Sequence, residues 1–137
     1  MISPLELNDN ELLEQIENCS LSPSFFTHEV QLRLAWILIR KFGLKLALVK
    51  NNQIKENYYI TALKSNKFNA TLTKAYVEIL NYFMEKSSTN SFDKLLNEFP
   101  RLRYNFKNLV KTHYGYNILK EHRTKEPPSN RPILFTF

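Results

Sequence analysis

The chain has 137 residues, of which 43% are hydrophobic and 23% are charged, and it carries a formal net charge of +6. This length and composition are typical of one globular domain and exclude an intrinsically disordered chain. The only glycines are Gly43 and Gly115, which disfavours a hairpin-rich sheet and glycine-lined phosphate loops. The single cysteine and the absence of a signal-peptide pattern lead us to expect a cytoplasmic protein.

The charge is distributed unevenly along the chain. Residues 1–32 contain six acidic residues and no lysine or arginine, and because the whole chain carries +6, the remaining residues carry +12. We expect the acidic start to lie against the basic remainder, where each surface ion pair contributes about 0 to 1 kcal/mol. The longest apolar run, Leu34 to Ile39, is shorter than the about 20 residues of a membrane span, so we expect no membrane partner.

Capping signals predict where the first helices begin. Asn8 followed by Glu11 predicts a helix over 9–19, within an acidic N-terminal helix and connection over 1–22. Ser22-Pro23 is typical of another helix start, because a capping side chain precedes a proline that is tolerated in the first turn.

The middle of the sequence has the pattern of core helices. The helix from Pro23 is apolar on most sides until Gly43 ends it, which is typical of the central helix of a bundle. A weaker apolar stripe continues the helical pattern over 44–64. After a polar turn, a regular stripe with a period of 3.6 residues predicts a further core helix over 72–86.

The last third predicts shorter elements. Ser91 caps a short helix, and Pro100 begins another that Gly115 ends. A final helix is predicted over 116–123. The proline-rich segment that follows predicts an extended C-terminal strap over 126–137, which docks its apolar residues on the helices.

Together these elements predict an all-α fold, a single-domain bundle of five to seven helices over residues 1–137. The residues that we expect in its core share the inward faces of the longer helices. They are Leu34, Trp36, Leu38, Leu72, Ile79 and Phe83.

The sequence lacks the common signatures of catalytic and metal sites. It contains no G-x-S-x-G, no P-loop or dinucleotide glycine pattern, no H-E-x-x-H and no pair of cysteines. It also lacks E-x-x-H, which di-iron helical bundles use twice. We therefore predict no cofactor and no metal, with a divalent metal at His28 as the less favoured alternative. Whether the protein is an enzyme is left open.

Two polar residues are predicted to face the core near the start of the central helix. His28 and Gln31 are three residues apart, so their side chains share one helix face. They either satisfy each other's hydrogen-bonding groups, as most buried polar groups do, or they line a ligand pocket. In such a pocket His28 acts as an acid, a base or a hydrogen-bond donor.

A second polar cluster opens the helix predicted over 72–86. Asn and Thr at a helix start are ordinarily caps. If this start meets the one near Pro23, however, the two clusters ring one cavity beside two helix N-termini, which favour an anionic group. We therefore predict a pocket for a small polar or anionic ligand, lined by His28, Gln31, Lys67, Asn69 and Thr73.

Three segments of the chain carry a family resemblance. They are 26–36, with the pattern F-x-H-x-x-Q-L-R-x-A-W, 67–73, with K-F-N-x-T-x-T, and 126–134. Together they resemble a family of small uncharacterised bacterial helical proteins, for which the resemblance implies no established activity.

In that family, the positions of Gln31 and Asn69 are often histidine, which with His28 implies a three-histidine metal site. Gln and Asn bind transition metals poorly through their amide oxygens. The resemblance therefore implies, for this chain, a pocket whose metal site has been lost or repurposed.

Other classes of function remain open. Arg103, Lys107 and Lys111 recur every four residues on the helix predicted from Pro100, and tyrosines lie among them. This basic stripe is either a solvated helix face or the binding surface of a non-enzymatic module for nucleic acid or an acidic protein. A structural subunit or homodimer is the third alternative.

Overall fold

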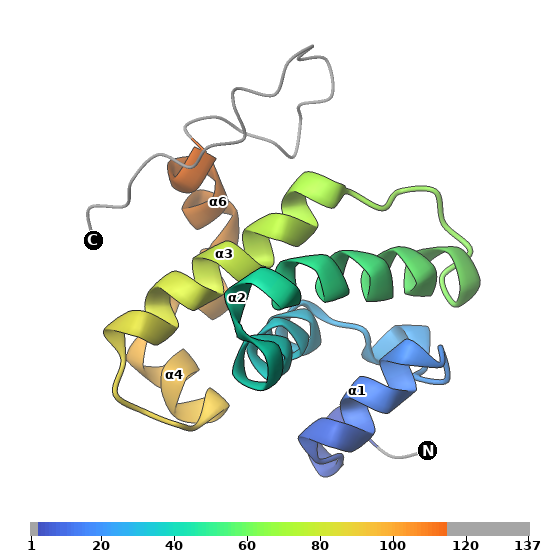
Figure 1. Cartoon of the computed structure of the whole chain (residues 1–137), viewed down its shortest axis with the longest axis horizontal. Helices are drawn as coiled ribbons and strands as arrows, with labels where there is room; N and C mark the ends of the chain where they lie inside the picture. The colour runs from blue at the N-terminus through green and yellow to red at the C-terminus, as the bar shows by residue number, and fades with distance from the viewer. Residues whose placement is uncertain (1–2, 115–137) are drawn as a thin grey trace. The chain divides into compact units, whose positions relative to one another are not determined.

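The computed structural model describes residues 3–114. The described residues form six α-helices and two 3-10 helices, and no strand (Figure 1). In chain order they are η1 (Pro4–Glu6), α1 (Asp9–Glu17), η2 (Pro23–Phe25), α2 (His28–Thr61), α3 (Ala70–Lys86), α4 (Phe92–Glu98), α5 (Arg101–Tyr104) and α6 (Phe106–Tyr114). The predicted all-α fold with five to seven helices is confirmed.

The chain divides into two compact units, Met1–Asn81 and Tyr82–Phe137. The single domain predicted over 1–137 stays a prediction. The helix predicted over 116–123 and the strap predicted over 126–137 lie outside the described residues. No described helix is long and apolar enough to cross a bilayer.

The first α-helix of the first unit is α1, which begins where the sequence predicts. Asn8 Oδ1 accepts a hydrogen bond from Glu11 N at 2.8 Å, and Asn8 N donates to Glu11 Oε1 at 2.9 Å. This reciprocal capping satisfies two backbone N–H groups that the helix itself leaves unpaired. The inward face of α1 is apolar and buried, through Leu12, Leu13 and Ile16.

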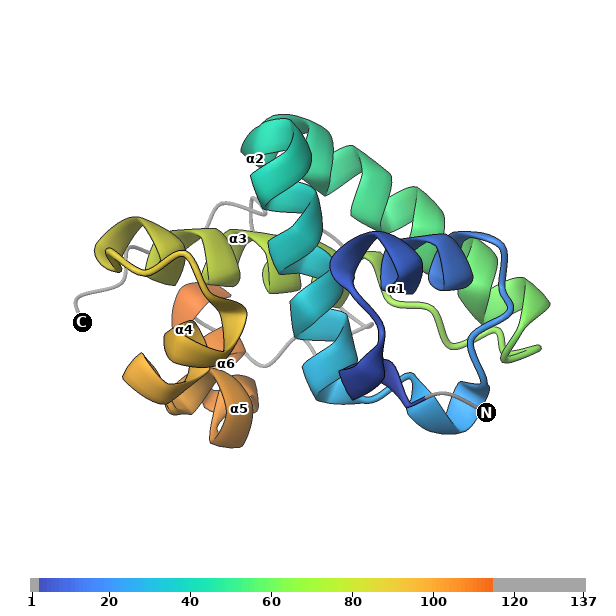
Figure 2. The ribbon, with the colours of Figure 1, turned by 90° about the horizontal axis from the view of Figure 1, so that it is seen from below.

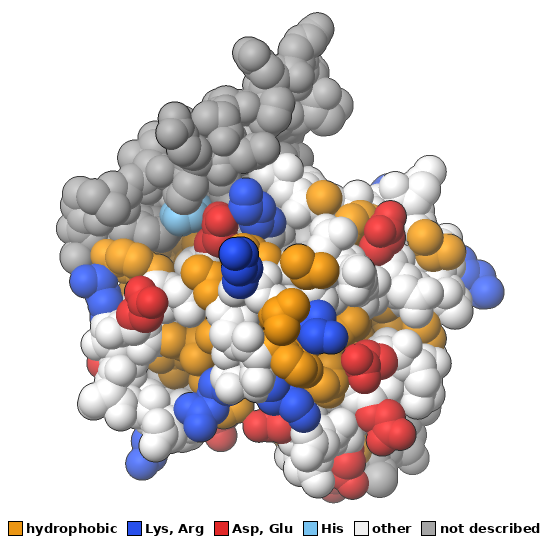
Figure 3. Space-filling model, in the orientation of Figure 1, with side chains coloured by type: hydrophobic (Ala, Val, Ile, Leu, Met, Phe, Trp, Pro, Cys, Tyr) orange, Lys and Arg blue, Asp and Glu red, His pale blue; other side chains and the backbone are white. Residues whose placement is uncertain are grey.

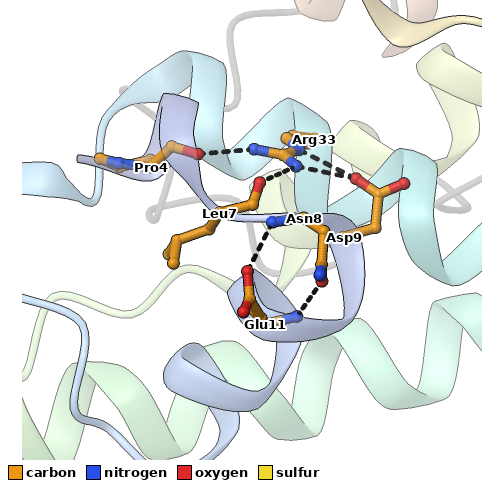
Figure 4. A network of polar contacts seen from close by, with 6 residues as sticks. All are labelled: Pro4, Leu7, Asn8, Asp9, Glu11 and Arg33. Atoms are coloured by element: carbon orange, nitrogen blue, oxygen red, sulfur yellow. Dashed lines mark hydrogen bonds and ion pairs between the residues drawn. The ribbon is translucent and has the colours of Figure 1, made fainter. Parts of the chain in front are cut away.

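One arginine of α2 joins that helix to the N-terminal segment (Figure 4). The Arg33 guanidinium donates to the carbonyl oxygens of Pro4 at 2.9 Å and Leu7 at 2.8 Å. It also donates to Asp9 Oδ1 through Nη2 at 2.9 Å and Nε at 3.1 Å. The expected pairing between the acidic start and the basic remainder therefore includes this contact between α1 and α2.

The start of α2 differs from the sequence prediction. Pro23–Phe25 form the separate 3-10 helix η2, and α2 begins at His28, with Thr27 Oγ1 accepting from Val30 N at 3.2 Å. The Ser22 side chain makes no capping hydrogen bond to the described turn that follows it. The Ser22-Pro23 signal therefore marks a single short turn, whereas Thr27 supplies the side-chain cap of the long helix.

Gly43 bends α2 rather than ending it. Its backbone angles are φ +82° and ψ 168°, in a region that is open to glycine but strained for residues with a Cβ. Helical structure resumes directly after it, so the helix predicted over 44–64 is present through Thr61. The two halves of α2 run in different directions (Figure 2).

Most of the predicted core is buried. Leu34, Trp36, Leu38, Ile79 and Phe83 are each less than a tenth exposed. Leu72 is only half-buried, because it lies in the first turn of α3, beside the polar connection that follows α2.

The second unit contains the end of α3 and three shorter helices. Ser91 caps α4 by accepting from Lys94 N at 3.3 Å, as predicted. The rings of Phe83 and Phe99 lie 4.9 Å apart. The helix predicted from Pro100 is interrupted at Asn105, whose backbone (φ −143°, ψ 34°) is not helical, and so forms α5 and α6. Pro100 itself is the N-cap of α5.

Candidate functional site

The second half of α2 carries a lysine on its buried face. Ala47, Asn51, Lys55 and Tyr58 recur at steps of four, four and three residues, so they share one side of the helix. All four are buried, and Lys55 is only 2% exposed. A lysine at this depth is rare in proteins unless its charge is paired.

The amine of Lys55 lies over an aromatic ring. Its Nζ is 4.0 Å from the centre of the Tyr76 ring, on α3. Within the described residues no carboxylate lies within 4 Å of this amine, since the ion pairs there are Arg33–Asp9 and Lys74–Glu78. Burial lowers the pKa of Lys55 from 10.5 to about 7, because the protein interior disfavours the charged form.

Tyr76 connects this lysine to the start of α2. Its Oη is hydrogen-bonded to His28 Nδ1 at 2.7 Å, and the two ring centres lie 5.4 Å apart. Burial, together with the nearby Tyr59, raises the pKa of Tyr76, so its hydroxyl stays protonated at neutral pH. One residue of α3 therefore contacts both ends of the site.

The bend at Gly43 explains how this contact is possible. His28 and Lys55 are 27 residues apart in α2, which would separate them by about 40 Å along a straight helix. Because the helix bends at Gly43 instead, both residues reach the same tyrosine. The glycine thus shapes the site without contributing a side chain to it.

A buried amide completes the cluster. Asn51 has no exposed surface, and its Nδ2 donates to the carbonyl oxygen of Thr73 at 3.2 Å. Its Oδ1 is also buried and has no hydrogen-bond partner among the described residues. Such an orphaned acceptor costs about 1 to 3 kcal/mol. We use the name Lys55 cluster for His28, Asn51, Lys55, Thr73 and Tyr76.

Two of the residues predicted for the pocket belong to this cluster. His28 is half-buried and bonded to Tyr76, while Thr73 is 3% exposed. The Thr73 hydroxyl donates to the carbonyl oxygen of Asn69 at 2.8 Å, at the start of its own helix. Thr73 therefore takes part through its backbone carbonyl, which accepts from Asn51.

The other predicted pocket residues lie elsewhere in the first unit. Asn69 caps α3, with Oδ1 accepting from Leu72 N at 2.9 Å, which is the structural role weighed for it from the sequence. Gln31 is half-buried and Lys67 is exposed. In the described part of the chain, neither of these two side chains is hydrogen-bonded or ion-paired to the Lys55 cluster.

The candidate basic face in the second unit is not the continuous stripe that the sequence predicts. Arg103 lies on α5, whereas Lys107 and Lys111 lie on α6 beyond the break at Asn105. Lys107 and Lys111 are exposed, and Arg103 is half-buried, with its guanidinium carbon 5.6 Å from the centre of the Tyr104 ring. In the view of Figure 3, basic side chains are interspersed with acidic and hydrophobic ones.

The described residues offer few ligands for a metal ion. Among residues 3–114, no group of three or more His, Cys, Asp or Glu side chains lies close enough together to hold an ion. The Lys55 cluster offers one imidazole but no carboxylate or thiolate, whereas zinc sites in proteins use three or four such ligands. Whether His28 binds a divalent metal stays an open prediction.

The sequence analysis missed Asn51 and Lys55. The available signal was their spacing from Ala47 and Tyr58, which places two polar residues on the stripe that should be apolar. This stripe is short and follows a bend, so its inward direction was not evident from the preceding residues.

Comparisons with protein-family models, curated proteins and solved structures found no match. The resemblance to small bacterial helical proteins therefore stays a prediction from the sequence.

Proposed function

We propose that this protein binds a small anionic ligand at the Lys55 cluster. One observation carries the proposal: an almost fully buried lysine amine with no carboxylate within 4 Å among the described residues. Burying a cation without a counter-charge costs several kcal/mol, whereas an apolar side chain of similar length would fill the same space. A bound anion would supply the missing negative charge.

The remaining groups of the cluster suit a ligand that is both anionic and polar. The Tyr76 ring contacts the amine, and its hydroxyl, bonded to the His28 ring, adds two hydrogen-bonding groups to the cluster. Asn51 Oδ1 needs a donor, which a hydroxyl or a protonated acid group of the ligand would provide. In this proposal the positive charge comes from Lys55, and not from Lys67, the one lysine among the pocket residues predicted from the sequence.

The proposal is tested by calorimetry with inorganic phosphate and oxalate at pH 8. Because Lys55 is mostly neutral there, an anion that binds beside it should draw a proton from the buffer. Repeating the titration in buffers of different ionisation enthalpy measures that proton uptake.

Two variants make the test specific. Lys55→Met should abolish binding and the proton uptake. Lys50→Met is the matched control, because Lys50 also lies over a ring, 4.7 Å from the centre of Phe42, but is more exposed. Equal binding by the native protein and Lys55→Met would refute the site.

We include in this proposal three further expectations from the sequence. They are the cytoplasmic location, the kinship with the small bacterial helical family and the possibility of catalysis on the ligand. A nucleic-acid module remains the competing function. It predicts binding through Lys107 and Lys111 that weakens steeply with salt, whereas ligand binding at a buried lysine should weaken far less.

A further inference from the structure

We propose that Lys55 Nζ forms an imine with the carbonyl carbon of a small aldehyde or 2-oxo acid that carries an anionic group. The inference rests on the proposed function, because the anionic group of the substrate would occupy the same cluster. It adds a covalent step and names the class of substrate.

The surroundings of Lys55 are those of a nucleophilic amine. Imine formation requires the neutral amine, whose lone pair attacks the carbonyl carbon. In the free protein, no carboxylate of the described residues lies within 4 Å of the amine to hold it protonated. In the complex, the anionic group of the substrate stabilises the positive charge of the iminium that forms after the attack. The side chain is 2% exposed, so it lacks the water shell that stabilises an ordinary lysine cation.

The resulting difference from other lysines is large. With a pKa of about 7, Lys55 is neutral in about half of the molecules at pH 7, against roughly one in 3,000 for an ordinary lysine. The titratable group that contacts it is Tyr76, whose hydroxyl is bonded to His28, and Tyr59 acts on Tyr76. The pKa of the Tyr76 hydroxyl is raised, so that group adds no negative charge at neutral pH.

The step balances without any other reagent. The amine nitrogen bonds to the carbonyl carbon, and a proton moves from nitrogen to the former carbonyl oxygen to give a carbinolamine. This hydroxyl then takes a second proton, donated by the Tyr76 hydroxyl, and leaves as water, while nitrogen and carbon form the double bond of an iminium. The iminium nitrogen returns its remaining proton to the Tyr76 oxygen and so becomes the neutral imine. No oxidation or reduction occurs, and hydrolysis reverses the sequence.

Tyr76 is placed to assist this proton transfer. Its ring lies beneath the amine, and its hydroxyl, on the same rigid group, is bonded to His28. A protonated phenol can donate to the departing hydroxyl, and His28 can return a proton to it. The two residues therefore form a relay from the half-buried imidazole to the reacting atoms.

The experiment traps the imine on the full-length protein. The protein is incubated with glyoxylate at pH 7, sodium borohydride reduces any imine to a stable amine, and peptide mass mapping locates the adduct. We expect Lys55 to be labelled at least about tenfold faster than Lys50, because of its larger neutral fraction. Propanal, an aldehyde without charge, should label Lys55 more slowly than glyoxylate, and oxalate should protect it.

Control variants separate this inference from the proposed function. Lys55→Met should lose the fast adduct, and Lys50→Met should retain it. Tyr76→Phe should slow labelling, because it removes the hydroxyl that donates the proton to the departing oxygen. Labelling of Lys55 no faster than that of Lys50 would overturn the imine, even if oxalate binds in calorimetry and so supports the proposed function. Fast labelling by propanal, without protection by oxalate, would overturn both the anionic substrate class and the anion site.

Discussion

Two cations of helix α2, Arg33 and Lys55, are held in opposite ways within the same compact unit. The Arg33 guanidinium binds Asp9 and two backbone carbonyls, at distances of 2.8 to 3.1 Å. Lys55 is more deeply buried, yet among the described residues its amine meets the face of the Tyr76 ring and no carboxylate. The fold supplies polar partners for the cation that joins its elements, whereas among the described residues it supplies no carboxylate for the other one.

The largest expected effect is the dependence of stability on pH. The folded pKa of Lys55, about 7, lies below the unfolded value of 10.5. Between these values the unfolded chain binds a proton that the folded chain does not, so stability rises with pH. The slope is at most about 1.4 kcal/mol per pH unit. Below pH 7 this contribution is constant.

The window for that measurement is about pH 7 to 9.5. Above it, tyrosines deprotonate in the unfolded chain, and the raised pKa of Tyr76 works in the opposite direction. Urea unfolding of the native protein and of Lys55→Met should therefore differ most near pH 6 to 7, with the variant more stable. A native protein with no rise across the window would mean that Lys55 is not buried as a neutral amine.

The next largest effect is expected from removing the Arg33 side chain. Arg33→Ala should lower the free energy of unfolding by about 2 to 4 kcal/mol, because it removes four hydrogen bonds and the ion pair with Asp9. Arg40→Ala is the control, since Arg40 is exposed on the same helix. Urea denaturation measures both variants. A loss below about 0.5 kcal/mol for Arg33→Ala would show that the network of Figure 4 is not structural.

A smaller effect concerns the bend that brings His28 and Lys55 to one tyrosine. Gly43→Ala should cost about 1 to 2 kcal/mol, because a Cβ is strained at φ +82° although no described atom would lie within 4 Å of it. Lys45→Ala, at an exposed helical position, should change stability little. Anion binding should weaken in Gly43→Ala but not in Lys45→Ala. An unchanged affinity for the anion in both variants would show that anion binding does not depend on the bend at Gly43.

The smallest effect sharpens the role of the tyrosine. Tyr76→Phe removes the hydroxyl bonded to His28 but keeps a ring beneath Lys55. We expect a loss of about 0.5 to 1.5 kcal/mol in thermal unfolding and little change in the pKa of Lys55. A large shift in the pKa of Lys55 would instead mean that the Tyr76 hydroxyl, and not burial, sets that pKa.

The sequence predicted the helices better than the polar interior. Local signals mark the start of α1 at Asn8 and of α4 at Ser91, because a cap acts within three residues of itself. The same kind of signal misplaced the start of α2, since Ser22-Pro23 begins only a 3-10 turn. The sequence predicts that Gly43 ends the helix. In the structure its φ and ψ are not helical, but the chain only bends there and continues as a helix.

The candidate site depends on tertiary contacts that no local pattern contains. His28 and Thr73 were singled out because they are polar residues at helix starts, and the structure puts both beside Asn51 or Tyr76. Lys55 was overlooked because a lysine within a helix is ordinarily exposed. Its burial follows from the bend in α2 and the approach of α3, which only the folded chain brings together.

The central claim is that Lys55 is a buried amine without a counter-charge in the described part of the chain, and that an anion supplies that charge. The most direct measurement is an NMR titration of the Lys55 Nζ and Cε resonances, assigned by comparison with Lys55→Met. The account predicts a pKa of about 7 in the free protein, and a clear rise when oxalate is bound. A pKa near the ordinary value of about 10.4, unaffected by oxalate, would contradict it.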